Sequence, residues 1–99
     1  MAIETKLFDA AEILNSDARI AAYLEEAFED GNTTVIAAAL GTVARARNMS
    51  MIARDTGLTR ETLYKALSAE GNPTLSTLTA VTKALGFHLS IKPNAPSAG

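Results

Sequence analysis

The stretch that most constrains the fold is residues 49–67, "MSMIARDTGLTRETLYKAL", in which two helix-forming runs are joined at Gly57. Counted from Met49, the fifth residue is Ala53, and a small side chain suits the place where two short helices cross. The ninth residue is Gly57, and glycine readily adopts the positive backbone angle φ that a tight turn requires. The fourth, tenth and fifteenth residues are apolar: Ile52, Leu58 and Leu63. Together these features predict a helix-turn-helix with an apolar inner face.

Elsewhere apolar residues recur every three or four positions, and a polar capping residue precedes each such run, which is typical of amphipathic helices. The expected helices cover residues 9–14, 17–29, 33–47, 51–56, 60–68 and 75–85, with the expected N-caps Asp9, Ser16, Asn32 or Thr33, Ser50, Thr59 and Thr74. The residues expected to form the buried stripe of 33–47 are Val35, Ile36, Ala39, Leu40 and Val43.

The segment after Gly86, "FHLSIKP", alternates with the period of a β-strand. One face would carry Phe87, Leu89 and Ile91, and the other His88, Ser90 and Lys92. A lone strand forms no sheet, so it must pair with its symmetry mate in a homodimer or with a strand of another protein.

The expected fold class is therefore all-α, with five to six helices, a helix-turn-helix of lambda-repressor-like type and a short C-terminal β-strand. We divide the chain into an acidic helical segment at 1–31, a DNA-binding domain with the strand at 32–92, and a disordered tail at 93–99.

Composition excludes several classes of function. The 99 residues, 47% of them hydrophobic, fit a single small domain, and a domain of this size gains stability from a homodimer. The absence of cysteine removes disulfides and thiolate chemistry, and one histidine without a glycine-rich phosphate loop leaves no catalytic constellation. We expect no enzyme activity, no cofactor and no metal site. The N-terminus resembles neither a signal peptide nor a membrane span, so we expect a cytoplasmic protein with no membrane partner.

Charge is distributed unevenly along the chain, although the net charge is only −2. Residues 1–31 hold two basic and eight acidic side chains, a net charge of −6, whereas residues 32–99 hold seven basic and three acidic ones, a net charge of +4. An acidic first third joined to a basic remainder indicates two electrostatically different surfaces, suited to two different partners.

If the second helix of the helix-turn-helix enters a DNA major groove, the side chains in its first two turns reach base edges. Arg60 suits paired hydrogen bonds to guanine, and Glu61 can accept from a cytosine amine. The candidate DNA-binding residues are Thr59, Arg60, Glu61 and Lys65 for bases, and Ser50, Tyr64, Arg45, Arg47 and Arg54 for phosphates. The alternative is an ordinary helix hairpin in which Arg60 and Glu61 are merely solvated and Tyr64 is a packing residue.

Beyond these local patterns, the chain resembles a known family in five pieces, in order and at matching spacing: "YLEEAFEDG", "IAAALGTVARARNMS", "ARDTGLTRETLYKALS", "GNPTLSTL" and "ALGFHLSI". Between about Phe8 and Ile91 it resembles the addiction-module antidote proteins of the Xre-type helix-turn-helix class, related to HigA antitoxins. The resemblance implies a small toxin of the RelE or ParE superfamily as partner, and repression of the shared operon by a dimer bound to operator DNA.

Many antidotes bind their toxin with a long disordered tail, but here only "NAPSAG" could serve, so a folded segment must do so. The acidic residues Glu25, Glu26 and Glu29 are the candidate toxin contacts, and the alternative is a solvated helix face. Two other functions stay open: a stand-alone helix-turn-helix transcriptional regulator without a toxin, and an adaptor that has lost DNA binding.

Overall fold

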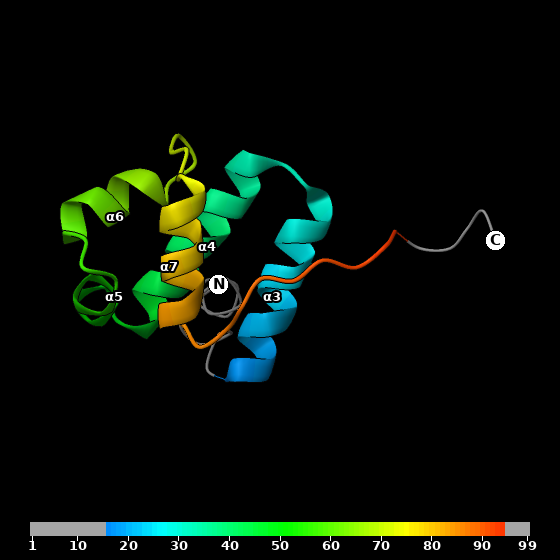
Figure 1. Cartoon of the computed structure of the whole chain (residues 1–99), viewed down its shortest axis with the longest axis horizontal. Helices are drawn as coiled ribbons and strands as arrows, with labels where there is room; N and C mark the ends of the chain where they lie inside the picture. The colour runs from blue at the N-terminus through cyan, green and yellow to red at the C-terminus, as the bar shows by residue number, and fades with distance from the viewer. Residues whose placement is uncertain (1–15, 95–99) are drawn as a thin grey trace, which may run out of the picture.

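Five helices make up the part of the chain that the computed structural model describes, residues 16–94 (Figure 1). They are α3 (Asp17–Asp30), α4 (Thr33–Arg47), α5 (Met49–Thr56), α6 (Arg60–Ala66) and α7 (Leu75–Ala84). The predicted all-α class is confirmed for these residues. The helix expected over 9–14 and most of the expected tail lie outside the described residues.

Side-chain caps determine where the helices begin. The side chains of Ser16, Asn32, Thr59 and Thr74 accept backbone N–H groups at the starts of α3, α4, α6 and α7, as predicted. The prediction for α5 was wrong: the cap is Asn48, whose Oδ1 accepts the Met51 N–H at 3.1 Å, and Ser50 lies inside the first turn. Asn48 also ends α4, so a single residue joins the two helices and α5 begins earlier than expected.

The ends of α6 and α7 follow different backbone geometries. α6 ends at Ala66 rather than Ser68, because Leu67 leaves the helical region with φ −102° and ψ 51°. After α7, the Gly86 N–H donates to the Lys83 carbonyl at 2.9 Å and the Phe87 N–H donates to the Thr82 carbonyl at 3.0 Å. With Gly86 at φ 93°, this is the Schellman arrangement that ends helices at glycine. It fixes the direction in which the C-terminal segment leaves the helix.

The predicted β-strand at 87–92 is not present in the single chain. Residues 87–94 run past α3 without regular secondary structure (Figure 1). Leu89 is 39% exposed and Ile91 is 99% exposed. The strand prediction fails here because a ladder needs a second strand, and residues 16–94 supply none.

In the core, α3, α5 and α6 pack against α4, and α7 packs mainly against α5. Its largest fully buried side chains are Ile20, Leu40, Ile52, Leu63, Leu67, Val43 and Val81. Val35, expected in the buried stripe of α4, is instead 41% exposed. It lies in the first turn of α4, beside the α3–α4 connection at the edge of the fold away from α5 and α6, so fewer elements cover it (Figure 1).

Gly41, in the middle of α4, lies directly against the end of α6. A Cβ atom at this position would lie 2.0 Å from the backbone carbonyl oxygen of Leu67, the residue that follows α6. Any side chain would therefore push the end of α6 away from α4. Within residues 16–94, no helix has the length and apolar character needed to cross a membrane.

Candidate nucleic-acid interface

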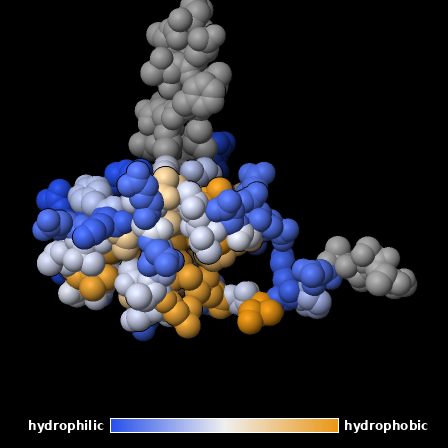
Figure 2. Space-filling view, turned by 90° about the horizontal axis from the view of Figure 1, so that it is seen from above, coloured by the Kyte–Doolittle hydropathy of each residue, from blue (hydrophilic) through white to orange (hydrophobic). Residues whose placement is uncertain are grey.

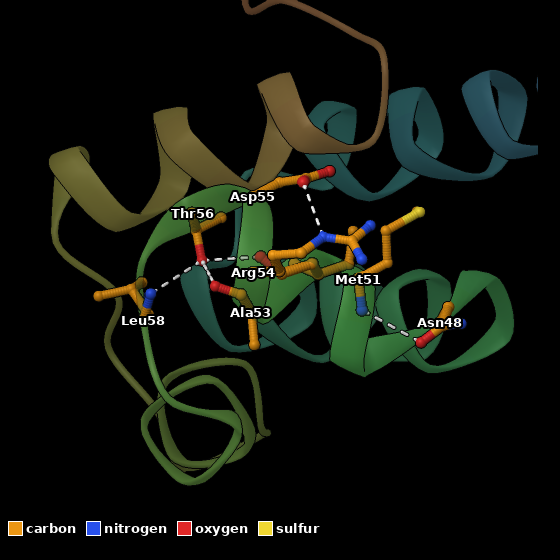
Figure 3. A network of polar contacts seen from close by, with 8 residues as sticks. Asn48, Met51, Ala53, Arg54, Asp55, Thr56 and Leu58 are labelled. Atoms are coloured by element: carbon orange, nitrogen blue, oxygen red, sulfur yellow. Dashed lines mark hydrogen bonds and ion pairs between the residues drawn. The ribbon is translucent and has the colours of Figure 1, made fainter.

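The hairpin of α5 and α6 is built around a three-residue turn, Gly57 to Thr59. Gly57 has φ 78°, and its N–H donates to the Ala53 carbonyl at 2.9 Å. The Thr56 hydroxyl donates to the Ile52 carbonyl at 2.8 Å and accepts the Leu58 N–H at 3.3 Å, which ties the last turn of α5 to the chain beyond the glycine (Figure 3). The turn is thus held by hydrogen bonds on both sides of the glycine.

One side of α6 is buried and the other carries the predicted base-contacting side chains. Leu63 is 0% exposed and anchors the helix in the core. Arg60, Glu61, Tyr64 and Lys65 are all exposed, Tyr64 at 41%. The structure therefore places three of the four predicted base contacts on one short helix, together with Tyr64, and the fourth, Thr59, is the N-cap of that helix.

Thr59, predicted as a base contact, also caps the N-terminus of α6. Its Oγ1 accepts the Thr62 N–H at 3.0 Å and lies 2.8 Å from the Thr62 hydroxyl oxygen. The hydroxyl is therefore engaged in capping α6, which leaves Arg60 and Glu61 as the free polar side chains in the first turn.

Apart from Tyr64 on α6, the predicted phosphate contacts lie on α4 and α5. Ser50 and Arg54 are exposed and four residues apart, so they share a face of α5. Arg54 Nε lies 3.7 Å from Asp55 Oδ1 at the solvent-exposed surface (Figure 3). Arg45 is exposed on the last turn of α4, and its Nη1 lies near Gly41, where α4 meets the end of α6. The hairpin residues 49–67 carry a net charge of +1, so the arginines of α4 supply much of the local positive charge.

Arg47 differs from the other predicted phosphate contacts because it is already paired. Its Nη2 lies 2.6 Å from Asp17 Oδ1, at the start of α3. This ion pair joins the acidic helix to the end of α4. No local sequence pattern predicts this pair, since the two residues are 30 positions apart.

The predicted toxin contacts lie on α3, at the other side of the molecule from α6 (Figure 1). Glu25, Glu26 and Glu29 are all exposed. Glu26 also borders a groove between α3 and α4, with Tyr23 and Val35 exposed among its lining residues and Asp30 a second carboxylate. All three glutamates line a second groove, between α3 and the segment 87–92. The acidic helix thus offers two concave surfaces with apolar and carboxylate groups.

No group of three or more metal-binding side chains occurs within residues 16–94. His88 is exposed on the C-terminal segment. The described residues therefore offer no candidate metal centre.

The fold and this surface define a small helical domain with a basic, polar α5–α6 hairpin on one side and an acidic helix on the other. The family model described as "Probable addiction module antidote protein" matches residues 4–93, and the chain belongs to this family. A protein of Haemophilus influenzae, described as "Uncharacterized protein", is 50% identical over 92 residues, which cover 93% of this chain and 95% of that protein. No solved structure matched the chain.

Proposed function

We propose that this antidote protein has two activities: it represses its own operon by binding operator DNA as a dimer, and it neutralises a toxin of the RelE or ParE type by direct contact. The observation that carries the proposal is the two-sided build of the domain. Burial of Leu63 orients α6 so that its polar side chains face solvent, while the carboxylates of α3 lie on the other side of the core.

DNA recognition is assigned to α6. Its N-terminal turn presents Arg60 and Glu61, and Lys65 follows one turn later. An α-helix fits the major groove, where an arginine can donate two hydrogen bonds to guanine and a glutamate can accept from cytosine. Each such pair discriminates against a wrong base by about 1–3 kcal/mol. The free side chains of the first turn would therefore determine the operator sequence.

Phosphate contacts are assigned to the residues around this helix. Ser50 and Arg54 on α5, Arg45 on α4 and Tyr64 on α6 are exposed hydrogen-bond donors. Such contacts set the position and register of a protein on the duplex without reading its sequence. Arg47 joins them only where a phosphate competes with Asp17 for its guanidinium group.

Toxin binding is assigned to the acidic side. The three glutamates of α3 give this side a negative field, which attracts a basic partner and raises the association rate. Residues near Glu26 also offer exposed apolar groups, Tyr23 and Val35, that a partner can bury. Charge would steer the toxin and the apolar groove would hold it.

Operator binding is tested by titrating the full chain against the DNA upstream of its own gene. Arg60→Ala should weaken specific binding about 5- to 150-fold, which corresponds to the loss of about 1–3 kcal/mol. The control is Lys83→Ala, which removes the same charge from an exposed site on α7. Equal binding by the Arg60→Ala variant and the wild type would overturn the assignment of α6.

Toxin binding is tested by co-expression with the product of the adjacent gene, followed by co-purification and growth assays. Changing Glu25, Glu26 and Glu29 together to lysine should abolish neutralisation and leave operator binding unchanged. Glu70→Lys, at an exposed acidic site outside α3, serves as the control. Full neutralisation by the triple variant would refute the role of the acidic helix.

A further inference from the structure

The segment 87–92 carries Ile91, the most exposed large apolar side chain of the described residues. Its Leu89 and Ile91 are 39% and 99% exposed, and an apolar spot stands out on the C-terminal extension, away from the body of the domain (Figure 2). Within residues 16–94, the last backbone hydrogen bond along this segment is the one that Phe87 donates to Thr82. The backbone beyond Phe87 therefore presents unpaired N–H and C=O groups beside apolar side chains, which is the state of an unpaired strand edge.

The segment 87–92 is anchored to the core at Phe87 and makes no backbone hydrogen bond to the other described residues after it. The glycine cap at the end of α7 and the partly buried Phe87 fix where the chain leaves the core. Pro93, which has no N–H group, limits a ladder at the other end. The residues between Phe87 and Pro93 are therefore long enough for one short strand, and the start of that strand is fixed by the core.

We infer that residues 87–92 are the dimer interface, and that the occupant is the same segment of a second copy, paired antiparallel across a two-fold axis. This inference rests on the dimer in the proposed function and names its surface. In an antiparallel pair, directly opposite residues lie on the same face of the sheet. The two-fold axis must therefore pass through a residue rather than between two residues, or apolar side chains would oppose polar ones.

An axis through Ser90 satisfies this condition. Ser90 then faces Ser90 of the second copy, and Leu89 faces the second copy's Ile91. The apolar face is then continuous across the two strands. Because the interface is symmetric, the Leu89–Ile91 contact occurs twice. An axis through Leu89 also keeps the faces and gives the same number of pairs. It places Ile91 opposite Phe87, however, whose N–H already donates to Thr82 and whose side chain packs against the core.

Charge also favours a second copy as occupant. The segment carries Lys92 and no carboxylate, and it shares its groove with the three glutamates of α3. A second copy of this segment adds a lysine and no carboxylate, so pairing brings no further negative charge to that groove. With an axis through Ser90, the two Lys92 residues are four strand positions apart, about 13 Å along the ladder and beyond the screening length of about 8 Å at physiological salt.

The arrangement fits the DNA side of the proposal as well. The segment lies at the opposite end of the molecule from α6 (Figure 1). A two-fold axis through it therefore leaves the α6 helices of both copies away from the dimer interface, with their side chains exposed for DNA.

Because the chain contains no cysteine, a single introduced cysteine reports the register directly. Opposite residues of an antiparallel ladder have Cα atoms about 4.5–5.5 Å apart, inside the range that a disulfide bridges. Full-length Ser90→Cys should form a covalent dimer under mild oxidation at least tenfold faster than two controls. Ile91→Cys lies about 8 Å from its equivalent in this register, which is too far for a disulfide. Ser76→Cys lies at an exposed position on α7.

Sedimentation of full-length variants tests the interface without cross-linking. Ile91→Asp should weaken dimerisation at least tenfold, while its thermal unfolding midpoint at matched low concentration equals that of the wild type. Val35→Asp, which places the same charge in the α3–α4 groove, should leave the dimer intact. Because both side chains are exposed, neither substitution removes a core contact.

The outcomes separate this inference from the proposed function. A dimer that resists Ile91→Asp and dissociates with Val35→Asp overturns the inference and moves the dimer interface to the α3–α4 groove, while operator binding by a dimer stands. A dimer unaffected by Ile91→Asp in a variant that no longer binds toxin makes the segment a toxin contact and also overturns it. A monomeric wild type refutes both the interface and the proposed dimer, whereas loss of operator binding in Arg60→Ala tests α6 alone.

Discussion

Replacing Gly41 with alanine gives a test in which the tertiary structure and local helix propensity predict opposite signs. The added Cβ would lie 2.0 Å from the Leu67 carbonyl oxygen, which is 1.0 Å short of the 3.0 Å below which Cβ contacts are essentially not seen. The neighbour is backbone, so no side-chain rotation relieves the overlap. The end of α6 must move by at least 1.0 Å, or α4 must bend.

The magnitude follows from two opposing terms. Alanine is favoured over glycine in a helix interior by about 1 kcal/mol. Inserting a methyl group into a filled space costs about 1–3 kcal/mol, and overlap with a carbonyl group belongs at the upper end. We therefore expect Gly41→Ala to lower the free energy of unfolding by about 2 kcal/mol, or about 8–16 °C in thermal midpoint for a domain of this size.

The assay is denaturant and thermal unfolding followed by circular dichroism, with the propensity term measured separately in the same chain. Thr79 is exposed on α7, so comparing Thr79→Gly with Thr79→Ala gives the local preference without a tertiary contact. At that site alanine should be more stable than glycine by about 1 kcal/mol. At position 41 the order should be reversed.

A Gly41→Ala variant that is more stable than wild type, by the amount measured at position 79, would refute the close approach of α4 and α6. The same shift has a functional consequence. Since Leu67 directly follows α6, displacing it moves the helix that carries Arg60, and operator binding should weaken along with stability.

Three further contacts are each tested by substitution. Thr59→Ala should lower the unfolding free energy by about 1 kcal/mol because α6 loses its cap, Thr59→Asp should retain it, and equal stability of all three proteins in thermal unfolding would contradict the cap. Asp17→Asn should lower the unfolding free energy by less than about 1 kcal/mol, because the side chains of Asp17 and Arg47 are 75% and 35% exposed. The same substitution should tighten DNA binding, because it frees Arg47 for a phosphate. Unchanged binding would remove Arg47 from the interface. Leu63→Ala should cost about 2–5 kcal/mol in denaturant unfolding, against about 0.5 kcal/mol for the neighbouring exposed Tyr64→Ala, and similar losses would contradict the burial of α6.

Much of the candidate site follows from local sequence. The turn at Gly57, the cap at Thr59 and the inward position of Leu63 were all expected, and they fix which side chains of α6 face solvent. Each depends on groups within a few positions along the chain. The error at Asn48 arose within the same range, since Asn48 and Ser50 are both good caps and only the actual end of α4 decides between them.

Local sequence therefore predicts the described helices and most of their N-caps, because capping hydrogen bonds and apolar periodicity act over three or four residues. It misplaces the start of α5 and the end of α6. The tertiary structure alone decided that Asp17 holds Arg47, that Val35 stays exposed, and that Gly41 admits no side chain. Those features depend on how helices far apart in the chain approach one another. Neither local sequence nor the fold of one copy is enough for the C-terminal segment. Its sequence alternates with the period of a strand, but a strand needs hydrogen-bond partners that a single copy of residues 16–94 does not provide.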